Sequence, residues 1–372
     1  MAGSWKKTVF STFYFIYTLS VGSEALDCLS NENKPVDWYI GYKLPNTAHN
    51  VQAYSLMYMD SDKPSWRLVK GTLDKPSNQA IYYTLSQIYN AKMNESGVGI
   101  GNSIAYAMYN DEKPTKMSLD RESSAEHGHT KGVLGFDEKT GFWLIQSTPR
   151  FPPAYKDGYS FPSTTNAQSF LCVSMETSKN LNEIGLQLQY NWPKIYDKNL
   201  PQFAAQYKEF GAALNGKHVD VAPWYRETKL VSLAGVLFLS FAKYSDWGKD
   251  LYADWLAPRF QDSLLVETWQ NGIEKMCSNC TGTYQVMNIA TLKFKAKGYE
   301  FKETQDHSKW AITNSSNLAW VCIGDINRQV PQMKRPGGTV CFQHKQVWTG
   351  FKNLVTGIHN CKVYNKCIPP DF

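Results

Sequence analysis

Apolar and polar positions follow the same order in two distant stretches of the chain. Residues 133–145 form an apolar run, a polar turn and a second apolar run, and residues 310–323 repeat that order. Two apolar runs that flank a turn rich in Gly, Asn, Ser and Asp are typical of a β-hairpin. Each return run also carries a tryptophan, Trp143 in the first and Trp320 in the second. We therefore predict two similar hairpins that arose by an internal duplication.

The rest of the pattern predicts strands mixed with helices in two similar halves, which together form an α/β sandwich. Apolar or alternating runs predict further strands at residues 38–40, 56–59, 104–109, 169–175, 186–190, 264–269 and 285–294. Apolar residues at helical spacing predict helices at residues 77–92, 202–214, 248–257 and 340–355. Residues 231–242 are the most apolar internal run, and their length suits a buried strand or helix segment.

The beginning of the chain has the pattern of a signal peptide. Lys6 and Lys7 precede the apolar and aromatic run 9–21, and small residues at 23–25 offer a cleavage site. The apolar run is too short to span a bilayer comfortably, and no later run approaches the length of a membrane span. We predict a signal peptide at 1–25, cleavage near Ala25, and no stable association with a membrane.

The chain after the signal peptide is long enough for two similar halves that pack as one unit. Pro193 and its polar neighbours interrupt the pattern. We therefore expect an N-terminal half at 26–195 and a C-terminal half at 196–372. Aromatic residues make up 14% of the chain, which favours globular folding over disorder. The formal net charge of +6 is weak support for an anionic partner, and it would grow at acidic pH.

The chain contains 8 cysteines, and an even number behind a signal peptide predicts disulfides formed in an oxidising compartment. Cys277 and Cys280 form a Cys-x-x-Cys, which could also mark a zinc or redox site, although no second such pair or His pair accompanies them. No Asp/Glu cluster with metal-ligand spacing and no His-Glu-x-x-His occurs, so we expect neither a metal site nor a cofactor. Glycosylation sequons begin at Asn94, Asn279 and Asn314.

A His-x-Lys precedes each hairpin: His129 and Lys131 before the first, His307 and Lys309 before the second. In an extended strand, residues i and i+2 point to the same face. Imidazole exchanges protons near neutral pH, and a lysine beside it can hold a phosphate oxygen. Two such pairs facing each other would cradle one phosphodiester. The alternative is two unrelated hairpins with histidines on the surface, because a short motif has a real false-positive risk.

The residues around both pairs resemble one known family, the deoxyribonuclease II family. The first signature comprises residues 128–132 (GHTKG), 142–145 (FWLI), Ser147 and 151–153 (FPP). The second comprises residues 306–310 (DHSKW), 322–328 (CIGDINR) and 337–341 (GGTVC). Further matches occur at residues 36–39, 42–45, 241–243, 251–252 and 255–256. The resemblance covers nearly the whole chain after the signal peptide.

This resemblance implies a phospholipase D-like fold and an acid, metal-independent endonuclease. Such an enzyme cuts double-stranded DNA with little sequence specificity and leaves 3′-phosphate ends. It also implies a lysosomal location reached through the secretory pathway, or secretion. For the cysteines, the resemblance suggests the pairs Cys28–Cys172, Cys280–Cys361 and Cys322–Cys341, with Cys277 and Cys367 left as an additional pair.

From the residues and the resemblance together we expect one histidine to attack phosphorus and the other to act as general acid. Lys131, Lys309 and Asn327 would stabilise the anionic transition state. Thr130 and Ser308, which lie inside the two motifs, and Gln146 and Ser147, which lie at or just beyond the return strand, would contact phosphate or DNA. We expect Gln146 and Asn327 to be equivalent residues of the two hairpins. Asp306 could orient His307. Asp325 and Arg328 are interpreted as a structural ion pair near the turn.

Gln146 departs from the family pattern, which usually has a histidine at that position. A neutral amide there could donate to a phosphate oxygen, or it could make a structural hydrogen bond at the strand end. The departure also leaves open a catalytically weakened, secreted relative that binds DNA. A phospholipase acting on lipid head groups is disfavoured, because that motif usually has an Asp five residues beyond the Lys, where this chain has Phe136 and Asn314.

Overall fold

The computed structural model describes residues 25–48, 51–91, 103–114, 126–272 and 274–361, together with residues 1 and 367. Nearly all of the predicted signal peptide and the predicted sequon at Asn94 lie outside these residues.

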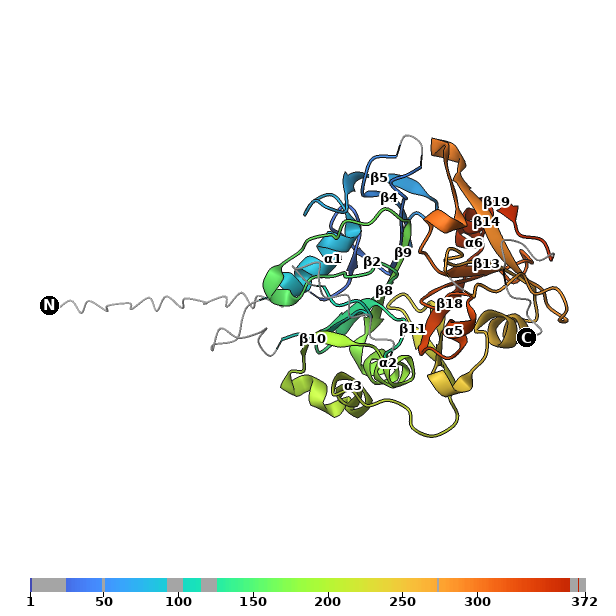
Figure 1. Ribbon diagram of the computed structural model, residues 1–372. Coiled ribbons are helices and arrows are strands. Elements are labelled where there is room, and N and C mark those ends of the chain that lie inside the picture. Colours follow the sequence, from blue (N-terminus) through green and yellow to red (C-terminus); the bar gives the residue numbers. More distant parts are fainter. Residues whose placement is uncertain are drawn as a thin grey trace.

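The first half of the chain builds an eight-stranded sheet in the order β10-β6-β7-β8-β9-β3-β4-β5 (Figure 1). Its strands are β3 (Trp38–Lys43), β4 (Ser55–Asp60), β5 (Arg67–Thr72), β6 (Ala105–Tyr109), β7 (Gly132–Phe136), β8 (Thr140–Gln146), β9 (Gln168–Glu176) and β10 (Ile195–Asn199). The predicted boundary between the halves falls where β10 begins, and β10 pairs with β6 in this first sheet. The division into two domains therefore stays a prediction.

The second half builds a nine-stranded sheet in the order β11-β12-β18-β17-β16-β13-β14-β15, with β19 paired to β14. Its strands are β11 (Tyr225–Val231), β12 (Leu237–Lys243), β13 (Leu264–Glu267), β14 (Val286–Phe294), β15 (Tyr299–Lys302), β16 (Trp310–Thr313), β17 (Trp320–Gly324), β18 (Gly337–Gln343) and β19 (Val355–Ile358). A small sheet of β1 (Cys28–Leu29) and β2 (Pro35–Val36) precedes both large sheets.

Among the α-helices of the described residues, only α2 is longer than 10 residues. The α-helices are α1 (Ala80–Tyr89), α2 (Thr177–Asn191), α3 (Lys208–Leu214), α4 (Ala257–Phe260), α5 (Val330–Met333) and α6 (Lys345–Lys352). A π-helical turn, η4 (Tyr252–Leu256), leads directly into α4. The 3₁₀ turns are η1 (Tyr155–Asp157), η2 (Gln202–Gln206), η3 (Ser245–Trp247), η5 (Lys295–Lys297) and η6 (Glu303–Gln305). Large mixed sheets flanked by a few helices confirm the predicted α/β class.

The two large sheets pack face to face over one shared core, to which α2 and α6 contribute. Trp38 of β3 and Phe342 of β18 meet in this core, with ring centroids 5.3 Å apart. Helix α1 covers the outer face of the first sheet, and η4 with α4 covers the outer face of the second (Figure 1). Because the two halves share their main apolar core, the sheet ends that face each other are fixed relative to one another. Residues from both halves can therefore form one site.

The predicted hairpins are present and their registers match. In the first hairpin, Gly132 of β7 lies opposite Ile145 of β8. In the second, Trp310 of β16 lies opposite Ile323 of β17. Each His-x-Lys directly precedes the first strand of its hairpin, so both motifs lie at corresponding ends of the two sheets.

Several predicted elements are wrong, and each error has a local cause. Residues 186–190 belong to helix α2, whose buried residues Leu181, Ile184 and Leu188 recur at helical spacing. Residues 340–355 contain strand β18 and helix α6 rather than one helix. The predicted helix 77–92 is shorter, and Gln79 rather than Ser77 caps it by accepting from the N–H of Tyr82.

Four disulfides staple the fold, and they are the same four pairs that the resemblance suggested. They are Cys28–Cys172, Cys277–Cys367, Cys280–Cys361 and Cys322–Cys341. All eight cysteines are thereby used, which leaves no thiolate for a zinc or redox site at Cys277 and Cys280. Asn314 is exposed in the turn between β16 and β17, at the end opposite His307, whereas Asn279 is half-buried beside Cys280. Within the described ranges, no helix combines the length and apolar character that crossing a membrane requires.

Candidate active site

The two His-x-Lys pairs lie where β7 and β16 begin, at the junction of the two sheets. The lysines are almost completely buried, with exposed fractions of 4% for Lys131 and 3% for Lys309. Both histidines are partly accessible, and 15% of the His129 side chain is exposed. In each pair, therefore, the histidine is partly accessible to solvent and the lysine is buried.

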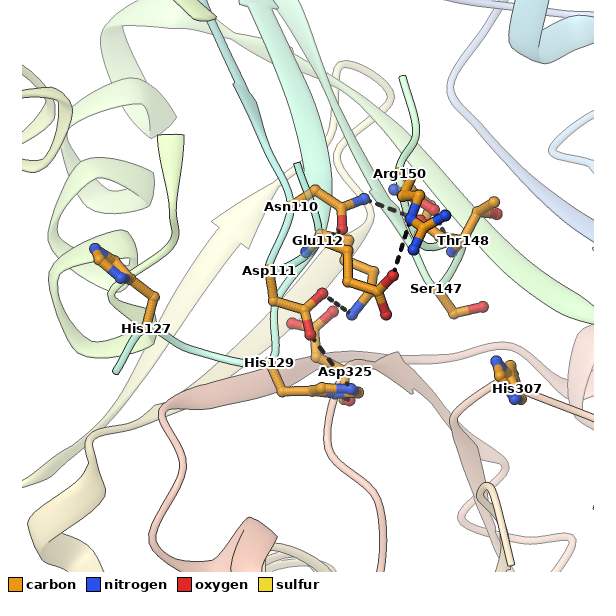
Figure 2. Close-up of polar contacts among 12 residues, drawn as sticks. Asn110, Asp111, Glu112, His127, His129, Ser147, Thr148, Arg150, His307 and Asp325 are labelled. Carbon is orange, nitrogen blue, oxygen red and sulfur yellow. Dashed lines mark hydrogen bonds and ion pairs between the residues drawn. The ribbon is translucent and has the colours of Figure 1, made fainter. Parts of the chain in front are cut away.

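His129 is held by the other half of the molecule. Its backbone N–H donates to the carbonyl oxygen of Pro336 (2.9 Å), and its Nδ1 donates to the carbonyl oxygen of Asp325 (2.6 Å). The second contact fixes the proton on Nδ1 in the neutral ring, so the Nε2 lone pair is available. Figure 2 shows His129 grouped with Asp111 and Asp325, while His127 is turned away from them.

Asp111 is the carboxylate at the centre of this group (Figure 2). Its Oδ1 forms an ion pair with Nζ of Lys131 (2.5 Å), and its Oδ2 lies 3.2 Å from Nη2 of Arg335 and 3.7 Å from Nε2 of His129. Burial alone would raise the pKa of Asp111, but the charges of Lys131, His129 and Arg335 outweigh it and hold the pKa well below its usual range. Asp111 is therefore ionised, and the side chains of Lys131, Arg335 and His129 all lie close to its carboxylate.

His307 has a corresponding set of contacts to the first half. Its backbone N–H donates to the carbonyl oxygen of Ala167 (2.9 Å). The amide of Asn166 donates to its Nε2 (3.0 Å). From its own half, the ring of Trp269 meets the His307 ring edge-on, with centroids 3.7 Å apart. Each histidine is thus positioned by the half of the chain that does not carry it.

Electrostatic coupling connects the two His-x-Lys pairs. Burial, followed by the charges of Lys309 and Lys131, lowers the pKa of His307 to about 3. Burial, followed by the charge of Lys131, lowers the pKa of His129 well below its usual range, and Lys309 contributes in the same direction. The charge of each lysine therefore lowers the pKa of the histidine in the opposite half. Both imidazoles are neutral at neutral pH.

Two further groups titrate near neutrality. Burial, followed by the charge of Lys131, lowers the pKa of Lys309 to about 7. Burial raises the pKa of Asp325 to about 7, against the opposing effects of Thr130 and the two lysines. As the pH falls through 7, Lys309 gains a positive charge and Asp325 loses a negative one. The site consequently becomes more attractive to an anion under acidic conditions.

The residues inside the two motifs are buried and engaged within the protein. Thr130 shares a hydrogen bond with the carboxyl group of Asp325. Ser308 Oγ lies 2.8 Å from the hydroxyl of Tyr42. Asp306 accepts from that same hydroxyl and from the N–H of Ser308 (2.8 Å), so its carboxylate supports the motif backbone instead of orienting the His307 ring as expected.

Gln146 and Ser147 are satisfied by local contacts. The Gln146 amide donates to the carbonyl oxygen of Phe151 (2.8 Å) and accepts from the N–H of Thr148, and the residue is 1% exposed. Ser147 Oγ donates to the Gln168 side chain (2.6 Å). This geometry favours the structural alternative for Gln146, since both ends of its amide are used by the turn that follows β8.

Asn327 and Gln146 are not equivalent in the two hairpins. The N–H of Gln146 donates to the carbonyl of Lys131, and the N–H of Gly324 donates to that of Lys309. Gly324 therefore corresponds to Gln146, and Asp325 to Ser147. Asn327 lies further along, where its Oδ1 accepts from the N–H of Trp269 (3.3 Å).

The expected ion pair between Asp325 and Arg328 does not form. Arg328 is buried and lies 3.2 Å from Asp250, whereas Asp325 lies in the site beside His129. Sequence reasoning also missed Asp111, Arg335, Asn166 and Trp269, which come from loops distant from both motifs. A carboxylate at the end of β6, the strand paired with β7, was the available signal for Asp111.

Comparisons with known proteins agree with these features. The profile of a family described as Deoxyribonuclease II matches residues 27–361, which include both His-x-Lys motifs. Plancitoxin-1 from Acanthaster planci is 40% identical over 347 residues, covering 91% of this chain and 93% of that protein. Deoxyribonuclease-2-alpha from Mus musculus is 37% identical over 351 residues, covering 92% and 96%. Deoxyribonuclease-2-beta from Homo sapiens is 34% identical over 349 residues, covering 92% and 93%.

Proposed function

The chain belongs to the deoxyribonuclease II family, and from this premise we propose that it is an acid, metal-independent endonuclease that cleaves double-stranded DNA with little sequence specificity. The observation that carries this proposal is the convergence of the two His-x-Lys pairs at the junction of the sheets. Each histidine is anchored by the opposite half, and each senses the opposite lysine. These contacts support the proposal that one phosphodiester is held between the two imidazoles.

In the proposed reaction, Nε2 of one histidine attacks phosphorus and the bond from phosphorus to the 5′ oxygen breaks. The other histidine, protonated, gives its proton to that leaving oxygen. Water then attacks the phosphohistidine with the second histidine acting as base, which frees the first histidine and leaves a 3′-phosphate end. Lys131 and Lys309 stabilise the negative charge that develops on the phosphoryl oxygens.

The acid requirement follows from the directions of the pKa shifts. The general acid must carry a proton, yet both histidine pKa values are lowered, so a low pH favours the reactive protonation state. A bound phosphodiester would raise both values, because it adds a nearby negative charge. Lys309 and Asp325 act in the same direction, because the site gains positive charge as the pH falls through 7.

The proposed independence from metal rests on the cations that the chain itself supplies. Lys131 and Arg335 both pair with Asp111, and Lys309 lies close enough for its pKa to be lowered by Lys131. In the proposal these cations would provide the charge stabilisation that a divalent ion provides elsewhere. For location, the four disulfides support an oxidising compartment. We propose a lysosomal location reached by the secretory pathway, or secretion, with glycosylation at the exposed Asn314 and at Asn279.

The alternative is a relative that binds DNA but cleaves it weakly, motivated by glutamine at position 146. The contacts of Gln146 make such a relative less favoured. Its amide serves the turn at 146–151, and both His-x-Lys pairs have their anchoring contacts. We therefore retain an active nuclease as the proposed function.

Incubation of the purified protein with supercoiled plasmid at pH 5 in EDTA tests the proposal. We expect nicking at pH 5, much less at pH 8, and ends that a polymerase extends only after phosphatase treatment. Loss of cleavage on adding EDTA would contradict metal independence. DNA binding without nicking would favour the weakened relative, and release of a head group from phospholipid vesicles would favour a lipid substrate.

A further inference from the structure

Two completely buried lysines occupy equivalent places in the two sheets. Lys43 is the last residue of β3, where it lies opposite Gln168, the first residue of β9. Lys243 is the last residue of β12, where it lies opposite Gly337, the first residue of β18. Both have an exposed fraction of 0%. The duplication has therefore placed one buried ammonium beside the start of β9 and another beside the start of β18.

Both ammonium groups bind neutral oxygens of the loops next to the active site. Nζ of Lys43 donates to the carbonyl oxygens of Leu44 (2.9 Å) and Asn166 (3.0 Å) and to Oδ1 of Asn46 (3.2 Å). Burying a charge on such partners is costly unless the hydrogen bonds are complete. Three acceptors around one ammonium satisfy its three donors.

Lys243 repeats this arrangement in the second half. Its Nζ donates to the carbonyl oxygens of Gln332 (3.0 Å), Met333 (3.0 Å) and Arg335 (2.6 Å). Asn166 and Arg335 are equivalent residues, since each lies two positions before the strand that the lysine faces. In each half, then, the buried lysine donates to the backbone carbonyl of an equivalent residue: Asn166 in the first half and Arg335 in the second.

The residues held in this way contact the two histidines. Asn166 donates to Nε2 of His307, and the next residue, Ala167, accepts the N–H of His307. Arg335 pairs with Asp111, which lies beside Nε2 of His129, and the next residue, Pro336, accepts the N–H of His129. A single path thus runs from each buried lysine through one loop to one histidine.

We propose that Lys43 and Lys243 are positioning residues, each fixing the loop that sets one histidine: Lys43 for His307, and Lys243 for His129. This inference rests on the proposed function, since it concerns the geometry of the same site. Supporting residues of this kind hold reactive groups in place, and a displacement of about 1 Å can cost about a hundredfold in rate. Burial lowers the pKa of Lys43 to about 8 and that of Lys243 to about 7, so both are charged at acidic pH.

The competing explanation is that each lysine only satisfies a buried cluster of carbonyls and stabilises the fold. Lys43→Met and Lys243→Met separate the two explanations, because methionine fills the space without donating. Gln79→Met is the matched control: Gln79 is equally buried and ties Lys75, Tyr82 and Tyr159 together on the outer face of the first sheet. It should lower stability without reaching either histidine.

The discriminating measurement is the long-range ¹H–¹⁵N spectrum of the imidazole rings in full-length protein labelled at its 7 histidines. Signals are assigned from His129→Ala and His307→Ala spectra. We expect Lys43→Met to shift the His307 signals and leave those of His129, and Lys243→Met to do the reverse. If a methionine variant does not fold, Lys43→Gln or Lys243→Gln keeps a buried amide donor group and should show the same crossed pattern in weaker form.

Plasmid cleavage at pH 5 provides the second readout. For both methionine variants we expect kcat to fall by about 10- to 100-fold with little change in KM, whereas Gln79→Met keeps the wild-type kcat. Lys43→Arg and Lys243→Arg, which retain the cation, should recover part of the loss. Histidine spectra and kcat values like those of Gln79→Met, or equal effects of each lysine on both histidines, would overturn the inference. A protein that never cleaves DNA yet shows the crossed pattern would overturn the proposed function and leave the positioning role supported.

Discussion

Asp325 changes its charge in the pH range where the site is proposed to become active. Its pKa is raised to about 7 by burial, so the side chain is neutral below that value. Its backbone carbonyl anchors His129, and an asparagine at this position would keep that contact. The side-chain charge can therefore be removed without removing the anchor.

We predict that Asp325→Asn weakens the pH dependence of DNA binding. Between pH 8 and pH 5, Asp325 and Lys309 both change charge in the wild-type site, whereas in the variant the change at residue 325 is lost. KM for plasmid should therefore rise less steeply from pH 5 to pH 8 in Asp325→Asn. The matched control, Asp62→Asn, removes an exposed carboxylate and should follow the wild-type profile. Parallel KM profiles for Asp325→Asn and the wild type would contradict the assignment.

The same pKa shift makes the stability of the fold depend on pH. The folded-state pKa of Asp325 lies above the unfolded value, so the folded state binds this proton more tightly. The associated stability is present below about pH 4 and is lost as the pH rises through about 7. The melting temperature of the wild type minus that of Asp325→Asn should therefore decrease as the pH is raised from 5 to 8.

Gln146→His tests whether position 146 belongs to the active site. The amide of Gln146 is buried and bound to Phe151 and Thr148. A histidine there would face the same turn, so we expect the pH profiles of plasmid cleavage to superimpose in shape at fixed ionic strength. A stronger DNA affinity at low pH and an acid limb displaced to lower pH would instead mean that residue 146 acts near the phosphate.

The His-x-Lys motifs could be identified from the sequence because the same short motif directly precedes both hairpins, although neither motif lies within a strand. Asn166 and Arg335 could not be identified, since they reach the histidines through contacts between loops of distant segments. The available signal for Asp111 was its place at the end of β6, the strand paired with β7. Gly324 rather than Asn327 corresponds to Gln146 for a similar reason: register depends on where the turn closes, and the two turns differ in sequence.

At the scale of elements, the hairpins were predictable because their apolar runs and turns are local signals. Helix α2 was not, because residues 186–190 alternate like a strand while the longer segment from Thr177 to Asn191 has a helical face packed between the sheets. Strand β18 was hidden for another reason. It is buried along most of its length and runs almost directly into α6, so its apolar residues and those of the helix read as one pattern.

The disulfide Cys322–Cys341 joins directly opposed residues of β17 and β18. Asp325 directly follows β17, and Pro336 directly precedes β18. The backbone carbonyls of these two residues accept the hydrogen bonds from His129. Replacing both cysteines by alanine should lower the free energy of unfolding by about 3 kcal/mol in the chain-entropy model. Urea denaturation at pH 5 measures this loss. Peptide mass spectrometry without reduction checks the pairing, and Cys322 found free or joined to another cysteine would contradict it.

At the scale of the whole molecule, the site exists because the halves are packed against each other. His129 is anchored by Asp325 and Pro336 of the second half, and His307 by Ala167 and Asn166 of the first. Neither half by itself brings together the two imidazoles and the two lysines. The sequence indicated the duplication, but the contacts that cross between the halves depend on the packing of two complete sheets.

The central claim is that His129 and His307 act together on one phosphodiester. The most direct test is the single-turnover rate of plasmid nicking at pH 5 in EDTA for the wild type, His129→Ala, His307→Ala and the double variant. Each single change should reduce the rate by roughly a thousandfold or more, and the double variant should be hardly slower than either, because groups that act as a unit lose their effect together. A single variant that keeps half of the wild-type rate, or losses that multiply in the double variant, would contradict the account.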